Sequence, residues 1–254
     1  MVVFPNAKIN IGLHVVEKRN DGFHNLESIF YPVPDLYDVL EMVENKKNKL
    51  EFTSSGIAIP GNTDDNLCIQ GYNLLKKDFN IPFVKIHLHK VIPIGAGLGG
   101  GSADAAFLLK ALNELFELSL SDNDLMGYAR KLGSDCAFFI KNEPVYAYHK
   151  GDEFESVNLD LSNYDIRVGY PNIHVSTAEA YSGVVPASRD INLKEVIQQP
   201  IETWKAIIKN DFENSILLKF PEIEALKKKM YQEGALYASM TGSGSAVYGI
   251  FEKH

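Results

Sequence analysis

Residues 93–106 read PIGAGLGGGSADAA, with five glycines between positions 95 and 101. Each glycine held in one conformation costs about 0.5–1 kcal/mol more than an alanine would, because glycine loses more backbone freedom on folding. A simple turn needs one or two such residues. Five of them predict a loop whose bare backbone approaches a ligand, and the structural alternative is a flexible hinge or a helix-packing turn.

The segments on either side of the loop predict a strand before it and a helix after it. Residues 85–92 alternate in polarity, and apolar residues recur at three and four positions over residues 105–116, as in an amphipathic helix. Ser102 is expected to cap this helix and Asp104 to lie in its first turn. Glycine-loop amides that lead into a helix N-terminus favour a phosphate-bearing ligand.

Three other kinds of glycine-rich loop fit this stretch less well. P-loops end in Gly-Lys-Ser/Thr, and Gly101-Ser102 lacks the lysine. A dinucleotide fingerprint matches formally at Gly95, Gly97 and Gly100, but no second strand ending in an acidic residue follows about 20 positions later. The loop of protein kinases lies in a hairpin, whereas a helix follows here. A long loop wrapped over a phosphate chain is the interpretation that survives.

Composition places the chain among globular proteins. It has 254 residues, 45% of them apolar and 23% charged, enough for one large domain or two ordinary ones. Neither a membrane-spanning stretch nor a secretory leader is evident, so we expect a cytoplasmic protein with no membrane partner. The net charge of −8 argues against nucleic acid as a partner. Cys68 and Cys136 lie far apart and predict reduced, partly buried thiols rather than a disulfide or zinc site.

Hydropathy patterns outside the loop predict a chain of mixed helices and strands. Strands are expected at residues 7–15, 26–33, 38–43, 50–53, 164–170, 236–240 and 246–251, and helices at residues 67–79 and 122–132. The charged residues 44–49 are expected to form a solvated hairpin end. In the first strand Lys8, Asn10 and Gly12 share one face. A domain boundary is expected near residue 150.

Four stretches of the chain resemble the GHMP kinase superfamily, a group of small-molecule kinases unrelated to P-loop enzymes. PIGAGLGGGSADAA is similar to the family's ATP loop. Three others are PNAKINIGLHV with RNDGFHNLESIF, then LGSDCAFF, then MTGSGSAVYGIF. They resemble the branch of the family whose substrate is a cytidine diphosphate-linked methylerythritol. The matches extend over residues 5–251 in the family's order, which makes chance agreement improbable.

The resemblance implies a two-domain GHMP kinase fold of the α+β class. Residues 1–150 would form an N-terminal domain that carries the ATP loop and is related to the second domain of ribosomal protein S5. Residues 151–254 would form a ferredoxin-like C-terminal domain, with the catalytic cleft between the two. Family members continue through another helix and strand after the position of Phe251, so we expect either an abbreviated second domain or a sequence that is cut short.

The resemblance also implies a reaction. ATP phosphorylates the 2-hydroxyl of the cytidyl substrate and leaves as ADP, in the non-mevalonate (MEP) route to isoprenoids. ATP implies Mg²⁺, whose ligands no carboxylate cluster identifies, so that Ser102 or the phosphates themselves are the candidates. The oligomeric state is expected to be a monomer or a weak homodimer.

The resemblance assigns ATP binding to the loop and to one distant dipeptide. The loop residues are Pro93, Ile94, Gly95, Ala96, Gly97, Leu98, Gly99, Gly100, Gly101, Ser102 and Ala103. Asn66 and Leu67 resemble the family's Asp-Asn-Leu stretch near the adenine. Ala103-Asp104 replaces the usual Ser-Asn, which puts a role for a second hydroxyl after Ser102 in doubt.

Two residues receive catalytic roles from the resemblance. Asp135, in LGSD, takes the position of the family's aspartate base; from the sequence alone it is more simply an N-cap, a role compatible with catalysis. Lys8 takes the position of the cation that keeps the base ionised, where the alternative is an ordinary solvated lysine. Asn10, on the same strand face, is expected to hold the substrate.

Cytosine recognition falls, by the same resemblance, to an aromatic group. Phe23 and Tyr181 are expected to sandwich the base, and His24 to hydrogen-bond its edge. Thr177 matches a ligand-contacting threonine. Phe23 stands where tyrosine is usual, and Ala178 stands where proline is common, which leaves the shape of that loop open.

Three other functions stay open from the sequence. Another GHMP kinase, of the mevalonate or homoserine type, would share the loop, whereas DGFH and Tyr181 favour the cytidyl substrate. A nicotinamide-dependent oxidoreductase is disfavoured by the incomplete dinucleotide motif. A nucleotide-binding protein without catalysis is disfavoured by the presence of Lys8 and Asp135.

Overall fold

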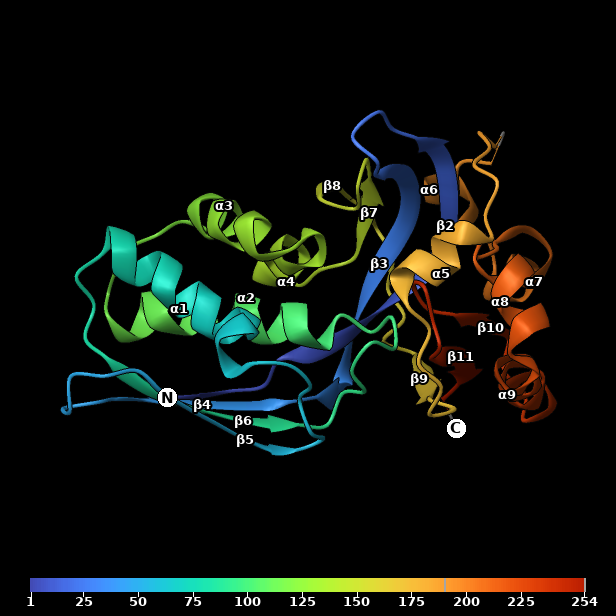
Figure 1. The fold of residues 1–254 in the computed structure, drawn as a ribbon. Helices are drawn as coiled ribbons and strands as arrows, with labels where there is room; N and C mark the ends of the chain where they lie inside the picture. The colour runs from blue at the N-terminus through green and yellow to red at the C-terminus, as the bar shows by residue number, and fades with distance from the viewer. Residues whose placement is uncertain (190, 254) are drawn as a thin grey trace. The chain divides into compact units, whose positions relative to one another are not determined.

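The computed structural model describes residues 1–189 and 191–253, which pack into two compact units (Figure 1). Unit 1 comprises Met1–Ala7, Val33–Ile94 and Gly99–Glu143, and unit 2 comprises Lys8–Pro32, Gly95–Leu98 and the chain from Pro144 onward. The chain therefore passes between the units twice within the glycine loop. The boundary expected near residue 150 refers to the two sequence domains of the family, which are defined differently from these two packing units. It stays a prediction.

Unit 1 contains a four-stranded sheet in the order β1-β4-β6-β5. These strands are β1 (Val2–Val3), β4 (Val39–Glu44), β6 (Val84–Lys90) and β5 (Glu51–Gly56). β6 pairs antiparallel with β4 and parallel with β5, so it lies between them. The expected hairpin at residues 44–49 is therefore wrong, because the strands on either side of it are not paired with each other.

Helices cover one face of this sheet (Figure 1). They are α1 (Leu67–Asp78), α2 (Gly100–Leu115), α3 (Asp122–Leu132) and α4 (Phe138–Lys141), with the short 3₁₀ turns η1 (Thr63–Asp65) and η2 (Ser134–Ala137). Asn66 caps α1, and Ser121 and Asp124 form a reciprocal capping box at the start of α3. Both helices begin where the sequence predicts, and α3 ends at Gly133 as expected.

Unit 2 contains two sheets. One has the order β2-β3-β7-β8 and the other the order β10-β11-β9. The strands are β2 (Asn6–Lys18), β3 (His24–Tyr37), β7 (Val145–Tyr148), β8 (Glu153–Ser156), β9 (Tyr164–Gly169), β10 (Tyr237–Met240) and β11 (Val247–Glu252). The first two residues of β2 and the last five of β3 belong to unit 1. β10 and β11 pair antiparallel across the turn at residues 241–246, which confirms the strand-turn-strand prediction.

Five helices accompany these sheets in the described part of unit 2 (Figure 1). They are α5 (Thr177–Ser182), α6 (Leu193–Val196), α7 (Ile201–Ile207), α8 (Glu213–Lys219) and α9 (Pro221–Gln232). The largest buried side chains include Trp204, Phe212, Tyr237 and Tyr248. In residues 1–189 and 191–253, no helix has both the length and the apolar character that crossing a bilayer requires.

A buried charge cluster fixes the chain just before the glycine loop. The Lys90 ammonium donates to Asp38 at 2.5 Å and to Asp104 at 2.8 Å, and all three side chains are at most 4% exposed. The other Asp38 oxygen accepts from the backbone N–H groups of Val91 and Ile92 at 2.6 and 2.9 Å. Since a buried charge must be paired to be tolerated, this cluster sets the direction in which the chain leaves β6.

Two carboxylates share one lysine in this cluster, so the charge of Asp104 is only partly compensated. Its Oδ1 has no hydrogen-bond partner among the described residues. Burial, opposed by the Lys90 charge and assisted by the Asp38 charge, raises the pKa of Asp104 to about 7. Because the folded pKa exceeds the ordinary value of 3.8, this carboxyl stabilises the fold fully below about pH 4. The contribution is lost as the pH rises through 7.

Asp104→Asn should therefore stabilise the protein relative to the wild type increasingly as the pH rises. The amide keeps an acceptor for Lys90 but removes the uncompensated charge. We expect the difference in melting temperature to grow by several degrees in favour of the variant between about pH 5 and about pH 8, measured by thermal unfolding. Asp122→Asn, at an exposed acid of α3, is the control. A difference that stays constant with pH would contradict the assignment.

Candidate functional site

Three glycines of the loop adopt a backbone conformation that other residues avoid. Gly95, Gly97 and Gly99 have φ angles of +69°, +78° and +72°. L-residues reach this left-handed region only at a cost, so these positions require glycine whether or not a ligand binds. The curved path that they allow brings the loop into α2.

Gly97 also meets a second requirement, because another backbone passes directly against it. A Cβ atom at this position would lie 2.1 Å from the carbonyl oxygen of Thr241. The Thr241 hydroxyl donates to the Gly97 carbonyl at 3.1 Å, and the Ala246 N–H donates to the Ala96 carbonyl at the same distance. The loop is thus docked on the β10–β11 turn within unit 2.

α2 begins in a different way from the one the sequence suggests. Its N-cap is Gly99, in the left-handed conformation, and its first residue is Gly100. The prediction that Ser102 caps the helix is wrong, because this serine already lies inside the first turn. Asp104 lies beyond that turn and faces Lys90, so its predicted position at the helix start is also wrong. Both errors arise because the left-handed glycine starts the helix earlier than a serine cap would.

Gly101 differs from its neighbours because nothing in the fold requires it. A Cβ atom there would meet no heavy atom within 4 Å, and the residue is exposed in the first turn of α2. By contrast, a Cβ atom on Gly100 would lie 2.9 Å from Ile92. An open glycine beside the free N–H groups of a helix N-terminus is the arrangement that lets an anion approach the backbone closely.

A pocket of about 180 Å³ in unit 1 adjoins this helix start. It is lined by Ile59, Pro60, Asn62, Asp65, Asn66, Leu67, Gly101 and Asp104. The structure therefore brings the dipeptide Asn66-Leu67 together with the loop's last glycine. The Asn66 side chain accepts from the Cys68 N–H at 2.9 Å, so capping of α1 holds this wall in place.

Asp135 lies in η2 and is half-buried. The position that caps this turn is Gly133, so the N-cap interpretation of Asp135 is wrong. Burial raises the pKa of the thiol of the next residue, Cys136, to about 11, and the nearby Ser102 side chain opposes this rise. Because Ser102 belongs to the first turn of α2, the segment that carries Asp135 packs beside the start of that helix.

Lys8 and Asn10 lie at the centre of a buried polar network in unit 2. The Lys8 ammonium donates to the Asn10 amide oxygen at 2.6 Å and lies 4.6 Å from the centre of the Phe30 ring. Asn10 donates in turn to Ser28 at 3.0 Å, and Ser28 donates to the Gly12 carbonyl. Lys8 is only 3% exposed. The alternative that Lys8 is an ordinary solvated lysine is therefore wrong.

Thr241 completes this network, whereas the sequence places it in a turn and in the stretch MTGSGSAVYGIF without giving it a role of its own. Its hydroxyl lies 3.2 Å from the Asn10 amide oxygen and accepts from the Asn10 N–H at 3.0 Å. The same residue contacts Gly97, so one side chain joins the Lys8 strand to the glycine loop. The two partners are 231 positions apart, and no local pattern signals such a contact.

The aromatic residues expected to bind a base are arranged differently from a simple sandwich. His24 stacks on Tyr181, with ring centres 4.5 Å apart and planes 20° from parallel, and Tyr181 packs edge-on against Phe212. Phe23 is 58% exposed, with the Lys150 ammonium 5.3 Å from its ring centre. The structure thus pairs His24, rather than Phe23, with Tyr181. Burial, followed by the charge of Lys18, lowers the pKa of His24, which favours its neutral form.

Thr177 is the first residue of α5, one turn before Tyr181, and is exposed. Its preceding residue, Ser176, caps the helix by accepting from the Glu179 N–H at 3.1 Å. Thr177 and Tyr181 are four positions apart and therefore lie on the same face of α5. This position makes the threonine available to a ligand that contacts the tyrosine.

Comparison with known proteins identifies relatives of the whole chain. Residues 66–143 match the family described as GHMP kinases N terminal domain, and residues 192–254 match GHMP kinases C terminal. A Cytophaga hutchinsonii protein named 4-diphosphocytidyl-2-C-methyl-D-erythritol kinase is 51% identical over 252 residues, covering 99% of this chain and 92% of that protein. A Bacteroides fragilis protein of the same name is 50% identical over 253 residues, with the same coverage.

A solved structure agrees with these sequence matches. It is described as 4-(cytidine 5'-diphospho)-2C-methyl-D-erythritol kinase and matches with a TM-score of 0.84 at 30% identity. The match covers 98% of this chain and 90% of that one. The two kinds of comparison therefore point to the same group of proteins.

Alanine at two glycines should separate the structural from the ligand-binding role of the loop. Gly97→Ala places a methyl group against the Thr241 carbonyl and should lower the melting temperature. Gly101→Ala meets no atom and improves helix propensity by up to about 1 kcal/mol, so stability should be kept or raised. If ATP phosphate approaches the open face of Gly101, the same methyl group should weaken ATP binding at least about tenfold.

Thermal unfolding and calorimetric titration with ATP measure these two effects. Wild-type ATP affinity in Gly101→Ala would show that the nucleotide does not approach the open face of this glycine. Wild-type stability in Gly97→Ala would contradict the structural role of Gly97, because it would show that the loop and the β10–β11 turn can move apart at little cost.

Proposed function

Since the chain belongs to the GHMP kinase family, we propose that it phosphorylates 4-diphosphocytidyl-2-C-methyl-D-erythritol. ATP is the donor, the 2-hydroxyl is the acceptor, and the products are ADP and the 2-phosphate, an intermediate of the non-mevalonate (MEP) route to isoprenoids. The observation that carries the proposal is the identity of about half of all residues, over 99% of the chain, with relatives that bear this substrate in their names.

The proposed ATP site uses backbone donors rather than a lysine-rich surface. The chain has a net charge of −8, so the nucleotide must find its positive potential locally. The amides of residues 95–101 and of the first turn of α2 supply it, because their N–H groups have no partner within the helix. We propose that the pocket beside Asn66 and Leu67 receives the adenine.

Mg²⁺ belongs to the proposal as the ion that neutralises charge on the phosphates. No cluster of three His, Cys, Asp or Glu side chains suited to a metal occurs among the residues that the structure describes. The Ser102 hydroxyl, in the first turn of α2, is the donor that fits, and the remaining ligands would be phosphate oxygens and waters, as Mg²⁺ commonly prefers.

Phosphoryl transfer needs alignment, charge stabilisation and an acceptor for the hydroxyl proton. We assign the proton to the Asp135 carboxylate. We assign Lys8 the task of favouring the ionised forms of the acid and of the attacking hydroxyl. Its ammonium is well suited because it is buried and oriented by Asn10, so its charge is little screened by water.

The cytosine is assigned to the aromatic group of unit 2. Stacking on an aromatic side chain stabilises a bound base by about 1–3 kcal/mol. His24 already covers one face of Tyr181, so the base is proposed to stack with this pair and the exposed Phe23 ring. Thr177 lies on the same face of α5 as Tyr181 and is proposed to contact the ligand.

The proposal also includes the oligomeric state and the cellular location of the enzyme. A small-molecule substrate and ATP need no further macromolecule, and we propose a monomer or weak homodimer. We also propose that the enzyme works in the cytoplasm, where ATP is supplied.

Coupled measurement of ADP release tests the proposed substrate. With ATP and Mg²⁺, the cytidyl alcohol should give turnover, whereas mevalonate and homoserine at the same concentration should give a rate at least about a hundredfold lower. Product analysis should find the new phosphate on the 2-hydroxyl. Preferred turnover of mevalonate or homoserine would keep the family and replace the substrate.

Conservative variants test the two proposed catalytic residues. Lys8→Met and Asp135→Asn keep side-chain size and should each lower kcat by about 10²-fold or more, with a smaller effect on KM. Lys85→Met and Asp122→Asn remove the same charges from exposed positions and should leave kcat unchanged. Near-normal kcat in a folded Lys8→Met or Asp135→Asn protein would remove that residue from the mechanism.

A further inference from the structure

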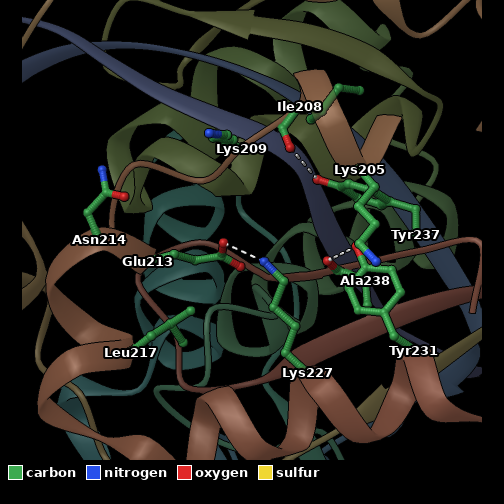
Figure 2. A pocket seen from close by; sticks show the side chains of 10 residues that line it. All are labelled: Lys205, Ile208, Lys209, Glu213, Asn214, Leu217, Lys227, Tyr231, Tyr237 and Ala238. Atoms are coloured by element: carbon green, nitrogen blue, oxygen red, sulfur yellow. Dashed lines mark hydrogen bonds and ion pairs between the residues drawn. The ribbon is translucent and has the colours of Figure 1, made fainter. Parts of the chain in front are cut away.

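Unit 2 holds a pocket that shares no residue with those assigned to the reaction (Figure 2). Its volume is about 320 Å³, and it is lined by Lys205, Ile208, Lys209, Glu213, Asn214, Leu217, Lys227, Tyr231, Tyr237 and Ala238. These residues come from α7, α8, α9, β10 and the segment between α7 and α8. Because all of them belong to unit 2, the shape of the pocket is set within that unit.

One wall of the pocket is apolar, and its two tyrosine hydroxyls are hydrogen-bonded to backbone carbonyls. The Tyr231 hydroxyl donates to the Ala238 carbonyl at 3.1 Å, and the Tyr237 hydroxyl donates to the Ile208 carbonyl at 3.5 Å (Figure 2). Tyr237 is only 1% exposed and closes the floor of the pocket, whereas the half-buried Tyr231 ring and Leu217 side chain offer apolar surface to a ligand. This wall therefore favours an organic group over a fully hydrated ion.

The charged part of the lining is cationic, with three lysines against one glutamate. Lys227 pairs with Glu213 at 2.6 Å, and the Lys205 ammonium lies 4.2 Å from the centre of the Tyr231 ring. In the part of the chain that the structure describes, neither Lys205 nor Lys209 has a carboxylate within 4.0 Å. On a chain with a net charge of −8, this excess of positive charge is local.

The pocket is also held in shape by a nearly buried carboxylate. Glu213 is 9% exposed and accepts from the Met240 N–H at 2.8 Å and from the Ser239 hydroxyl at 3.1 Å. These bonds fix the acid, and the acid fixes Lys227. A ligand that enters therefore meets walls that need little ordering, which lowers the entropic cost of binding.

We propose that this pocket binds a small ligand that combines a phosphate group with a short apolar body. Lys205 and Lys209 hold the phosphate, since a lysine ammonium commonly donates hydrogen bonds to phosphate, and the Tyr231 ring and the Leu217 side chain pack against the body. The volume lies near the lower end of the range for small-molecule sites, roughly 300–1,000 Å³, which favours a phosphomonoester smaller than a whole nucleoside triphosphate.

Calorimetric titration of the full chain with phenyl phosphate tests this site. The probe has a phosphate dianion and one ring, and benzyl alcohol provides the ring without the charge. Phenyl phosphate should bind at millimolar concentration, and benzyl alcohol should bind at least about tenfold more weakly. Lys205→Met with Lys209→Met should weaken phenyl phosphate at least about tenfold. Lys227 is left in place because its removal would strand the Glu213 charge.

Lys228→Met with Lys229→Met is the matched control, because it removes two charges from exposed positions of α9 that do not line the pocket. Loss of binding in the Lys205/Lys209 variant alone supports the proposal. If the two double variants bind phenyl phosphate with the same affinity, whether weakened or not, the probe binds elsewhere and the proposal is overturned. Absence of binding to the wild type at millimolar concentration, or equal binding of benzyl alcohol, would also overturn it.

Discussion

The close passage of the Thr241 carbonyl past Gly97 is the constraint on which the glycine loop depends. A Cβ atom on Gly97 would stand 2.1 Å from that oxygen, so only a bare backbone allows the loop and the β10–β11 turn to meet. Thr241 uses its hydroxyl on both Gly97 and Asn10. The contact at Thr241 therefore sets both the path of the loop and its position relative to the strand that carries Lys8 and Asn10. A ligand bound by the loop would be positioned by the same contact.

Buried polar groups anchor the loop from its two ends. On the entry side, Asp38 binds the N–H groups of Val91 and Ile92 and is itself held by Lys90. On the exit side, the backbone N–H of Lys8 donates to the Leu98 carbonyl at 2.9 Å. Each anchor uses ionic or backbone groups that would be costly to leave unpaired. This keeps the loop's own amides available while its ends stay fixed.

Local patterns were sufficient for most elements of the fold. The hydropathy patterns of residues 67–79, 122–132, 85–92 and 246–251 predict α1, α3, β6 and β11 near their observed limits. Quoted motifs pointed to the GHMP kinase fold of the α+β class, which the comparisons confirm. The start of α2 was misplaced because a serine is a better cap by composition than a glycine whose left-handed conformation is visible only in the structure.

The polar networks could not be obtained in the same way. Thr241 and Asn10 meet across 231 positions, and this contact depends on tertiary packing that no window of sequence contains. A signal for the Lys90 cluster was nevertheless present: Lys90 falls on the same face of β6 as Val84, Ile86 and Leu88, all of them buried. A lysine on an apolar face requires a buried acid. The hydrophobic pattern alone does not reveal which acids supply the pairing.

Hydrogen exchange of the backbone amides at residues 95–102 tests the central claim most directly, because the claim is that these amides grip the phosphates. With a non-hydrolysable ATP analogue and Mg²⁺, exchange at these positions should slow markedly, whereas adenosine should protect only the segment around Asn66 and Leu67. Equal protection of residues 95–102 by adenosine and by the ATP analogue, or none with either ligand at saturation, would contradict the account.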